Sequence, residues 1–169
     1  KMGIIYDAIG LIYLNTRSID KALEYHKKAL TIWRKNKDDI GAAIALSNMG
    51  NAYTMLKKYA EALVAYKESL TFSRKYNAES IQEKALSNIA NVYFKQGFYD
   101  SIKQYSQESL EISKRLDDSI SIAITQYQLA VYYFFRKDFG KSEALATEGF
   151  RISQRNNYTN SCHLNANIL

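Results

Sequence analysis

An internal repeat of 40 residues constrains the fold of this chain more than any other feature of its sequence. Shifting the chain by 40 positions aligns residues 45–53 (ALSNMGNAY) with residues 85–93 (ALSNIANVY) without a gap. The shift extends in both directions and gives four units, at residues 5–44, 45–84, 85–124 and 125–164, with residues 165–169 beginning a fifth. Repeats of this length stack on their neighbours, because one unit cannot bury its apolar face alone.

Each unit divides into two amphipathic helices. In the second unit, apolar residues recur at helical spacing at Leu46, Met49 and Tyr53, and again at Ala62 and Tyr66. Asp and Asn residues between the segments suit loops and helix N-caps. The 169 residues include no proline and 47% are apolar, which excludes proline-rich linkers and extended disorder. We therefore predict an all-α solenoid of stacked antiparallel helix pairs that forms one domain over residues 1–169.

One column of the repeat is always small and consists of Gly10, Gly50, Ala90 and Ala130. A larger side chain there would hold the paired helices apart. Small-x-x-Tyr on the first helix, followed by aromatic-x-x-Ala on the second, resembles the tetratricopeptide repeat, best at residues 50–53 (GNAY) and 59–63 (YAEAL). The 40-residue period and the absence of proline resemble the longer variety of bacterial signalling regulators, sensor kinases and spindle-orientation adaptors. The resemblance implies a right-handed superhelical solenoid, which would be the protein–protein interaction scaffold of a larger signalling or regulatory protein.

The resemblance also implies that the first helix of each unit lines a concave groove in which a peptide or partner segment binds. Helical geometry selects the residues opposite the packing face. The expected partner-binding residues are Ser47, Asn48, Asn51, Lys84, Ser87, Asn88, Asn91, Lys95, Tyr127, Gln128, Phe134 and Phe135. The same geometry turns Asp7, Phe94, Ile124 and Val131 toward the groove.

Asparagine recurs at the same two positions of successive units, first at Asn48 and Asn51 and then at Asn88 and Asn91. An amide both donates and accepts hydrogen bonds, so this ladder suits the backbone of an extended peptide; the alternative is bonding to neighbouring helices or contact with solvent. Lys84 and Lys95 lie about three helical turns apart and would attract a carboxylate. Phe134 and Phe135 suit either an apolar anchor pocket or packing under residues that follow Leu169.

Convergent catalytic groups are absent from the sequence. The two histidines, His26 and His163, lie more than three units apart, and the one cysteine, Cys162, directly precedes His163, so their side chains diverge on a helix. Neither a phosphate-binding loop nor metal-ligand spacing occurs. We therefore expect no enzymatic activity, no cofactor and no metal site, and we expect His26 to be packed or partly exposed and to have no functional role. Trp33 is expected either to be buried against residues that precede the chain or to anchor an interface.

The net charge of +6 is spread over the chain. Basic pairs recur near the ends of second helices, as at residues 34–35 and 74–75, where they stabilise the helix dipole or form a stripe for an acidic partner. Two of the expected groove residues, Lys84 and Lys95, are basic, and nucleic-acid binding needs more cations than this. No apolar run reaches the ~18 residues of a membrane span, so we expect no membrane insertion.

Two alternatives to a peptide-binding scaffold stay open. One is a helical repeat that binds nucleic acid, and the other is a module that associates with itself through exposed solenoid ends. We expect a cytoplasmic location, or a periplasmic one if the chain is the sensor region of a membrane kinase.

Overall fold

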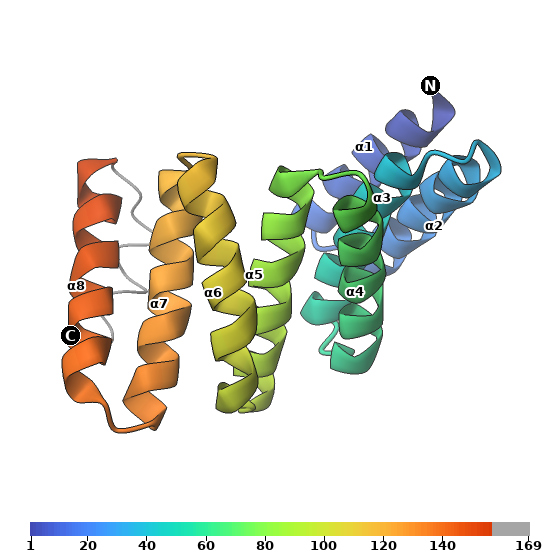
Figure 1. The fold of residues 1–169 in the computed structure, drawn as a ribbon. Coiled ribbons are helices and arrows are strands. Elements are labelled where there is room, and N and C mark those ends of the chain that lie inside the picture. Colours follow the sequence, from blue (N-terminus) through green and yellow to red (C-terminus); the bar gives the residue numbers. More distant parts are fainter. Residues whose placement is uncertain (157–169) are drawn as a thin grey trace. The chain divides into compact units, whose positions relative to one another are not determined.

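The computed structural model of this chain describes residues 1–156. Within them it contains eight α-helices and no strand. The helices are α1 (Met2–Asn15), α2 (Ile19–Lys35), α3 (Asp39–Met55), α4 (Tyr59–Lys75), α5 (Glu79–Gln96), α6 (Tyr99–Arg115), α7 (Ser119–Phe135) and α8 (Phe139–Arg155) (Figure 1). From α2 to α8, equivalent helices begin 40 residues apart, which confirms the all-α fold and the predicted period. Cys162, His163 and the expected start of a fifth unit lie outside the described residues.

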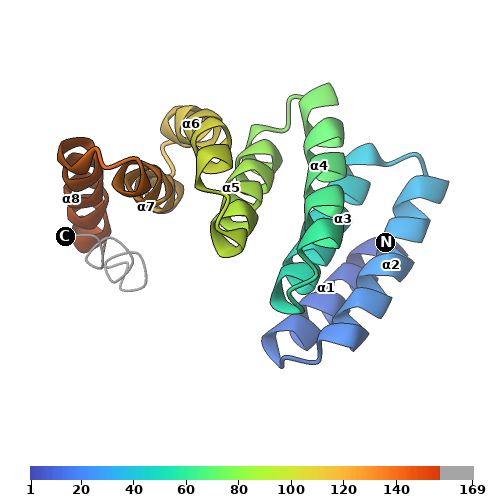
Figure 2. The ribbon, with the colours of Figure 1, turned by 90° about the horizontal axis from the view of Figure 1, so that it is seen from below.

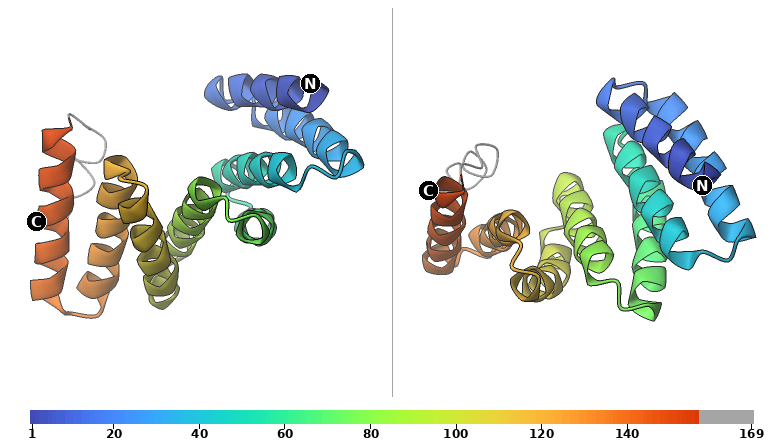
Figure 3. Two further views of the ribbon diagram at one scale, coloured as in Figure 1. Left: turned by 45° about the horizontal axis from the view of Figure 1, so that its top comes forward. Right: turned by 90° about the horizontal axis from the view of Figure 1, so that it is seen from above.

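Contacts divide the chain into two compact units, of which the first is Lys1–Ala85 and the second begins at Leu86, inside α5. In the first unit α1 packs on α2, α2 on α3, and α3 on α4 (Figure 2). In the second unit α6 packs on α7, and α7 on α8 (Figure 3). Each pair is antiparallel, because only two or three residues separate one helix from the next.

Each of the seven turns between the described helices contains one residue with a positive φ, and six of these seven residues are not glycine. The φ of Lys37 is 56°, and the φ values of the other non-glycine turn residues lie between 52° and 59°. The backbone N–H of Lys37 donates to the carbonyl of Arg34, and that of Asp38 donates to the carbonyl of Trp33, which satisfies the free carbonyls at the end of α2.

Aspartates begin several of the helices, as the sequence predicted. Asp38 accepts a hydrogen bond from the backbone N–H of Gly41 at 2.8 Å. Asp118 caps α7 through the N–H groups of Ile120 and Ser121. These side chains satisfy N–H groups that have no partner inside the helix.

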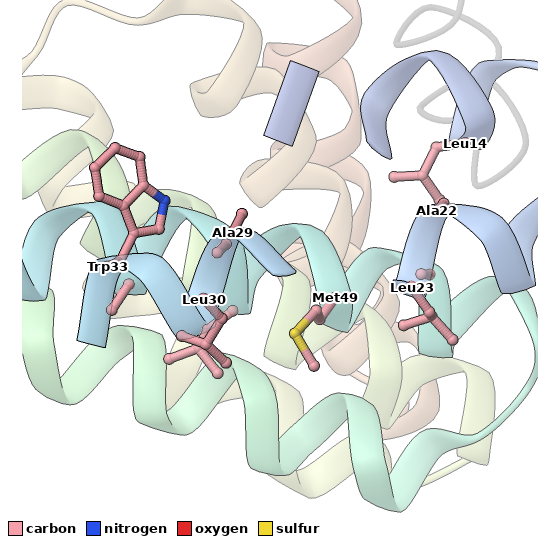
Figure 4. Packing of buried hydrophobic residues seen from close by; sticks show 11 residues of the cluster. Leu14, Ala22, Leu23, Ala29, Leu30, Trp33 and Met49 are labelled. Atoms are coloured by element: carbon pink, nitrogen blue, oxygen red, sulfur yellow. The ribbon is translucent and has the colours of Figure 1, made fainter. Parts of the chain in front are cut away.

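The core of the first unit lies between its paired helices. Leu23, Ala29, Leu30 and Trp33 of α2 are buried together with Met49 of α3 (Figure 4). Dense packing requires that glycines face the largest side chains. An added Cβ at Gly10 would lie 2.5 Å from His26, and one at Gly50 would lie 2.5 Å from Tyr66. The small column therefore makes room for large residues on the second helix.

A buried polar network joins α1 to α2. Oδ1 of Asp7 lies 2.9 Å from Nδ1 of His26, and the indole N–H of Trp33 donates to Oδ2 of Asp7 at 3.0 Å. His26 is fully buried, which is the first of the two alternatives expected for it, packing or partial exposure. The expectations for Trp33 and for Asp7 were wrong, because Trp33 is buried inside the first unit against Gly3 and Gly41, and the carboxylate of Asp7 turns inward to accept from it.

None of the described helices is both long enough and apolar enough to span a membrane.

Candidate functional site

A pocket of about 350 Å³ lies within the second unit, between α5 and α7. Its lining consists of Ser87, Asn88, Asn91, Phe94, Lys95, Ile102, Ile124, Tyr127, Gln128 and Val131. Six of the expected partner-binding residues therefore surround one cavity. They come from the first helices of two successive repeats, and Ile102 comes from the second helix between them.

Apolar and aromatic side chains form the wall of the pocket. The ring of Phe94 meets the ring of Tyr127 edge-on, with centroids 6.4 Å apart, and Ile102 and Val131 are buried beside them. Burial raises the pKa of the Tyr127 hydroxyl above its ordinary value. Tyr127 is half-buried, so water is partly excluded from its hydroxyl, and in such surroundings a hydrogen bond to a ligand is stronger than in bulk water.

Gln128 is held in place by two hydrogen bonds. The Ser106 hydroxyl donates to Oε1 of Gln128 at 2.9 Å, and Nε2 of Gln128 donates to the backbone carbonyl of Ser87 at 2.9 Å. The side chain thus ties α7 to both α6 and α5. Its polar atoms are largely occupied by these bonds, so Gln128 shapes the floor of the pocket more than it offers free groups.

The polar rim of the pocket is on α5. Asn88 and Asn91 are half-buried there, and Lys95 is exposed one helical turn beyond Asn91. An amide that lines an apolar pocket offers a donor and an acceptor, and a lysine offers a positive charge. The arrangement can hold a polar chain segment against the aromatic wall and attract an anionic group at one end.

The other expected residues lie elsewhere. Ser47, Asn48 and Asn51 are half-buried on α3 and belong to the first unit, as does the exposed Lys84. The Tyr66 hydroxyl donates to Oδ1 of Asn51 at 2.7 Å. Part of the asparagine ladder therefore bonds to a neighbouring helix, which is the alternative left open from the sequence.

Phe134 and Phe135 lie at the turn end of α7 and are not among the lining residues of the pocket. The ring of Phe135 stacks on that of Tyr99, with centroids 3.5 Å apart. Phe134 meets Phe135 and Phe139 edge-on, at 5.6 and 5.7 Å. Both phenylalanines remain partly exposed and form an aromatic cluster beside the turn.

Two residues that build the pocket were missed by the sequence reasoning. Ile102 lines the pocket and Ser106 fixes Gln128, and both belong to the second helix of their repeat. A signal was present for Ile102, because it occupies a column in which the first two units have alanine, at Ala22 and Ala62. Among the described residues, no group of three His, Cys, Asp or Glu side chains is placed to hold a metal ion.

Comparisons with known proteins agree with the family resemblance that the repeated residues of the sequence indicated. The tetratricopeptide repeat family matches residues 1–75 and 82–155. Curated protein sequences give no match. Similar solved structures include BtubC (BKLC) from P. vanneervenii, with a TM-score of 0.83 and 23% identity over 92% of this chain and 64% of that one.

Two Rap structures are also similar. The apo form of RapI has a TM-score of 0.86 and 16% identity, over 99% of this chain and 63% of that one. The Rap protein complexed with Competence and Sporulation Factor has a TM-score of 0.81 and 16% identity, over 96% of this chain and 46% of that one. The chain spans less than two thirds of the length of each of these structures. At these identities the likeness concerns the fold.

The fold of such repeats is generally a non-catalytic scaffold for protein–protein interaction. The family match extends over both units, and the 40-residue period places equivalent helices at equivalent intervals. The chain therefore belongs to the tetratricopeptide repeat family.

Proposed function

We propose that the pocket between α5 and α7 binds an extended peptide segment of a partner protein. The observation that carries this proposal is the convergence of Asn91 and Lys95 with an aromatic wall in one cavity. A peptide backbone needs both donors and acceptors, which the Asn91 amide supplies irrespective of the side chains of the peptide. The wall formed by Phe94 and Tyr127 takes up an apolar side chain.

The charge of the pocket favours a segment with a carboxylate. Lys95 is the one charged residue among the lining residues, and it lies at the exposed rim. A single cation gives local attraction for one acidic group. It does not provide the row of cations with which a protein releases counterions from nucleic acid, so the pocket favours a peptide over RNA or DNA.

A structural neighbour lends support to a role in signalling. A Rap protein of similar fold was solved in complex with Competence and Sporulation Factor. The shared fold is compatible with a scaffold that responds to a bound partner, and we infer a related role for this chain in signal transduction.

Selection from a phage-displayed library of random 12-residue peptides tests the proposal. We expect the selected peptides to be enriched in an acidic residue near an apolar one. Fluorescence anisotropy with a selected peptide should then show that Asn91→Ala and Lys95→Ala each weaken binding by about tenfold, the loss of one good polar contact.

Lys35→Ala is the matched control, because Lys35 is an exposed lysine in the last turn of another helix, α2. It should leave the affinity unchanged. Equal affinity of the wild-type chain and the two pocket variants, with helicity retained in circular dichroism, would refute the assignment of the site to this pocket.

A further inference from the structure

Two phenylalanines of the second unit are exposed at positions where the other repeats are mostly polar. Phe98, in the turn between α5 and α6, is 58% exposed, and Phe135, the last residue of α7, is 47% exposed. Both turns lie at the same end of this unit (Figure 1). The equivalent residues are Ser18, Lys58 and Asp138 for the first, and Asn15, Met55 and Lys95 for the second. Exposed aromatic residues at such positions are typical of a surface that binds a partner.

This exposure does not depend on a neighbouring repeat that the described chain lacks. The column of Phe135 is exposed in every repeat, including the three that a further repeat follows. Phe98 lies at a turn between helices that are all described. Phe134 and Phe139 do not belong to the surface, because their equivalents in the preceding repeat contact rings of the repeat that follows.

Both phenylalanines line a cavity of about 340 Å³, which we name the turn pocket. The ring of Tyr99 lines it as well. Its charged residues are Asp100 and Arg136, with Oδ1 of the first 3.7 Å from Nη1 of the second, and both side chains are exposed. An ion pair so exposed contributes little energy, so its groups stay available to a ligand. The turn pocket thus combines an aromatic wall with polar groups at its edge.

Aromatic rings connect the turn pocket to the pocket between α5 and α7. Phe94, in the wall of that pocket, is tilted against Tyr99, with ring centroids 6.3 Å apart. Tyr99 in turn stacks on Phe135, with centroids 3.5 Å apart. Because an extended chain advances about 3.3 Å per residue, about three residues cover the span from Phe94 to Phe135. One extended peptide is therefore long enough to occupy both pockets.

The charges beside the two pockets indicate what else the peptide carries. Lys95 is exposed at the rim of the first pocket, and Arg136 is exposed at the second. Asp100 offsets one of these charges, which leaves one positive charge for one carboxylate. Two small cavities joined by rings suit successive side chains of one extended chain.

We propose that the partner segment has two apolar anchor side chains about three residues apart and an acidic residue close to them. One anchor fills the pocket between α5 and α7, and the other fills the turn pocket. The inference rests on the proposed function, because it extends the peptide of that pocket to a second one.

Alanine scanning tests it on a 12-residue peptide selected on the wild-type chain from a phage-displayed library. We expect two apolar positions about three residues apart at which alanine weakens binding by about tenfold in fluorescence anisotropy. Phe98→Ser and Phe135→Asn should each weaken the same peptide by about tenfold. Both variants copy residues that other repeats carry there, so they should retain the circular dichroism spectrum of the wild type.

A peptide whose anchor for the turn pocket is alanine should bind the wild type and Phe98→Ser equally, because that variant then has no contact to lose. Leu116→Asn is the matched control. Leu116 is an exposed apolar residue that follows the other end of α6, and Asn36 holds the equivalent position. This variant should leave the affinity unchanged.

Asn91→Ala separates this inference from the proposed function. A peptide that loses affinity in Asn91→Ala but keeps it in Phe98→Ser and Phe135→Asn overturns the second anchor and leaves the proposed function standing. A peptide that is insensitive to all three variants, or a library that yields no binder, refutes both. Self-association of the wild-type chain that Phe98→Ser abolishes, without any change in peptide affinity, would assign the surface to a second copy and overturn the inference.

Discussion

The two units differ in the sizes of the side chains that face each other between the paired helices of a repeat. In the first unit a glycine of the first helix faces a large side chain of the second, as at Gly50 and Tyr66. In the second unit the same columns hold Ala90 and Ser106, a larger residue on the first helix and a smaller one on the second. In these two repeats the second helix thus carries a large side chain where the first helix has glycine, and a small one where the first helix has alanine.

This difference decides where a pocket can form. The long side chain of Tyr66 reaches across to Asn51 on the first helix. Ser106 is short, and Gln128 reaches it from α7. Asn91, the counterpart of Asn51, lines the pocket. Where the second helix has Ser106 in place of a tyrosine, the asparagine of the first helix, Asn91, faces a cavity.

The largest expected effect on stability comes from placing the serine of the second unit, Ser106, at the equivalent position of the first unit, Tyr66. Tyr66→Ser should lower the free energy of unfolding by about 3 to 5 kcal/mol, because it leaves a cavity opposite Gly50. Gly50→Ala alone should also destabilise, because its Cβ would lie 2.5 Å from the Tyr66 ring. The double variant Gly50→Ala/Tyr66→Ser reproduces the pair of the second unit, and urea unfolding should show it to be more stable than Tyr66→Ser alone. Additive losses would contradict the view that the pair shares one volume.

A second expected effect concerns the polar network of the first unit. Asp7→Ala removes the acceptor of the Trp33 indole N–H and the partner of His26, and all three residues are buried. Leaving two buried polar groups unpaired should cost about 2 to 4 kcal/mol in the free energy of unfolding. Asp7→Asn keeps an oxygen for Trp33 and should cost less in the same urea titration. A loss of less than about 0.5 kcal/mol for Asp7→Ala would argue that the network contributes little to the fold.

The third effect depends on pH. Burial raises the pKa of Tyr66 from 10.0 to about 12. A raised folded-state pKa gives stability that is fully present below pH 10 and is lost as the pH rises toward 12, because the unfolded tyrosine ionises first. The difference in stability between the wild type and Tyr66→Phe should therefore shrink over this range, by at most about 3 kcal/mol. Urea unfolding of both proteins at a series of alkaline pH values measures this difference.

The smallest expected effects compare the turns of the two units. Gly97 has a φ of 77° and an open surrounding, so Gly97→Ala should destabilise by about 1 kcal/mol through backbone strain alone. Lys57 has a φ of 59°, and Lys57→Gly should stabilise by about 0.5 kcal/mol. Gly140 is equally open but lies within α8, so Gly140→Ala should stabilise. Thermal unfolding of the three variants distinguishes the cases, and a gain in stability for Gly97→Ala would disprove the role of its φ.

The period of the sequence predicted much of the fold and part of the site. Helix starts follow the 40-residue spacing, and Asp38 caps its helix as expected, because both depend on local pattern. Asn91 and Gln128 line one pocket, because helical geometry places them on the same side of their helices. Asp7 was not predictable in this way, since an acidic residue on a helix resembles a surface residue until the Trp33 N–H is known to face it.

Other features depended on packing between segments. Phe135 was expected at the groove, yet the ring of Tyr99, which begins α6, stacks on it at the turn. Ser106 helps to fix the floor of the pocket because its hydroxyl donates a hydrogen bond to Gln128, which lies on another helix. Periodicity predicts which face of a helix a residue occupies, while the length and partner of its side chain decide what that residue contacts.

The short turns have a consequence for how the chain folds. In the first unit each helix packs on the next one in the sequence, so these contacts join residues a few tens of positions apart. Chains with such low contact order fold fast, because little loop entropy is lost before the first contacts form. Each helix pair of the first unit can thus form from local sequence, and during synthesis this unit can reach its native contacts while the ribosome is still extending the second.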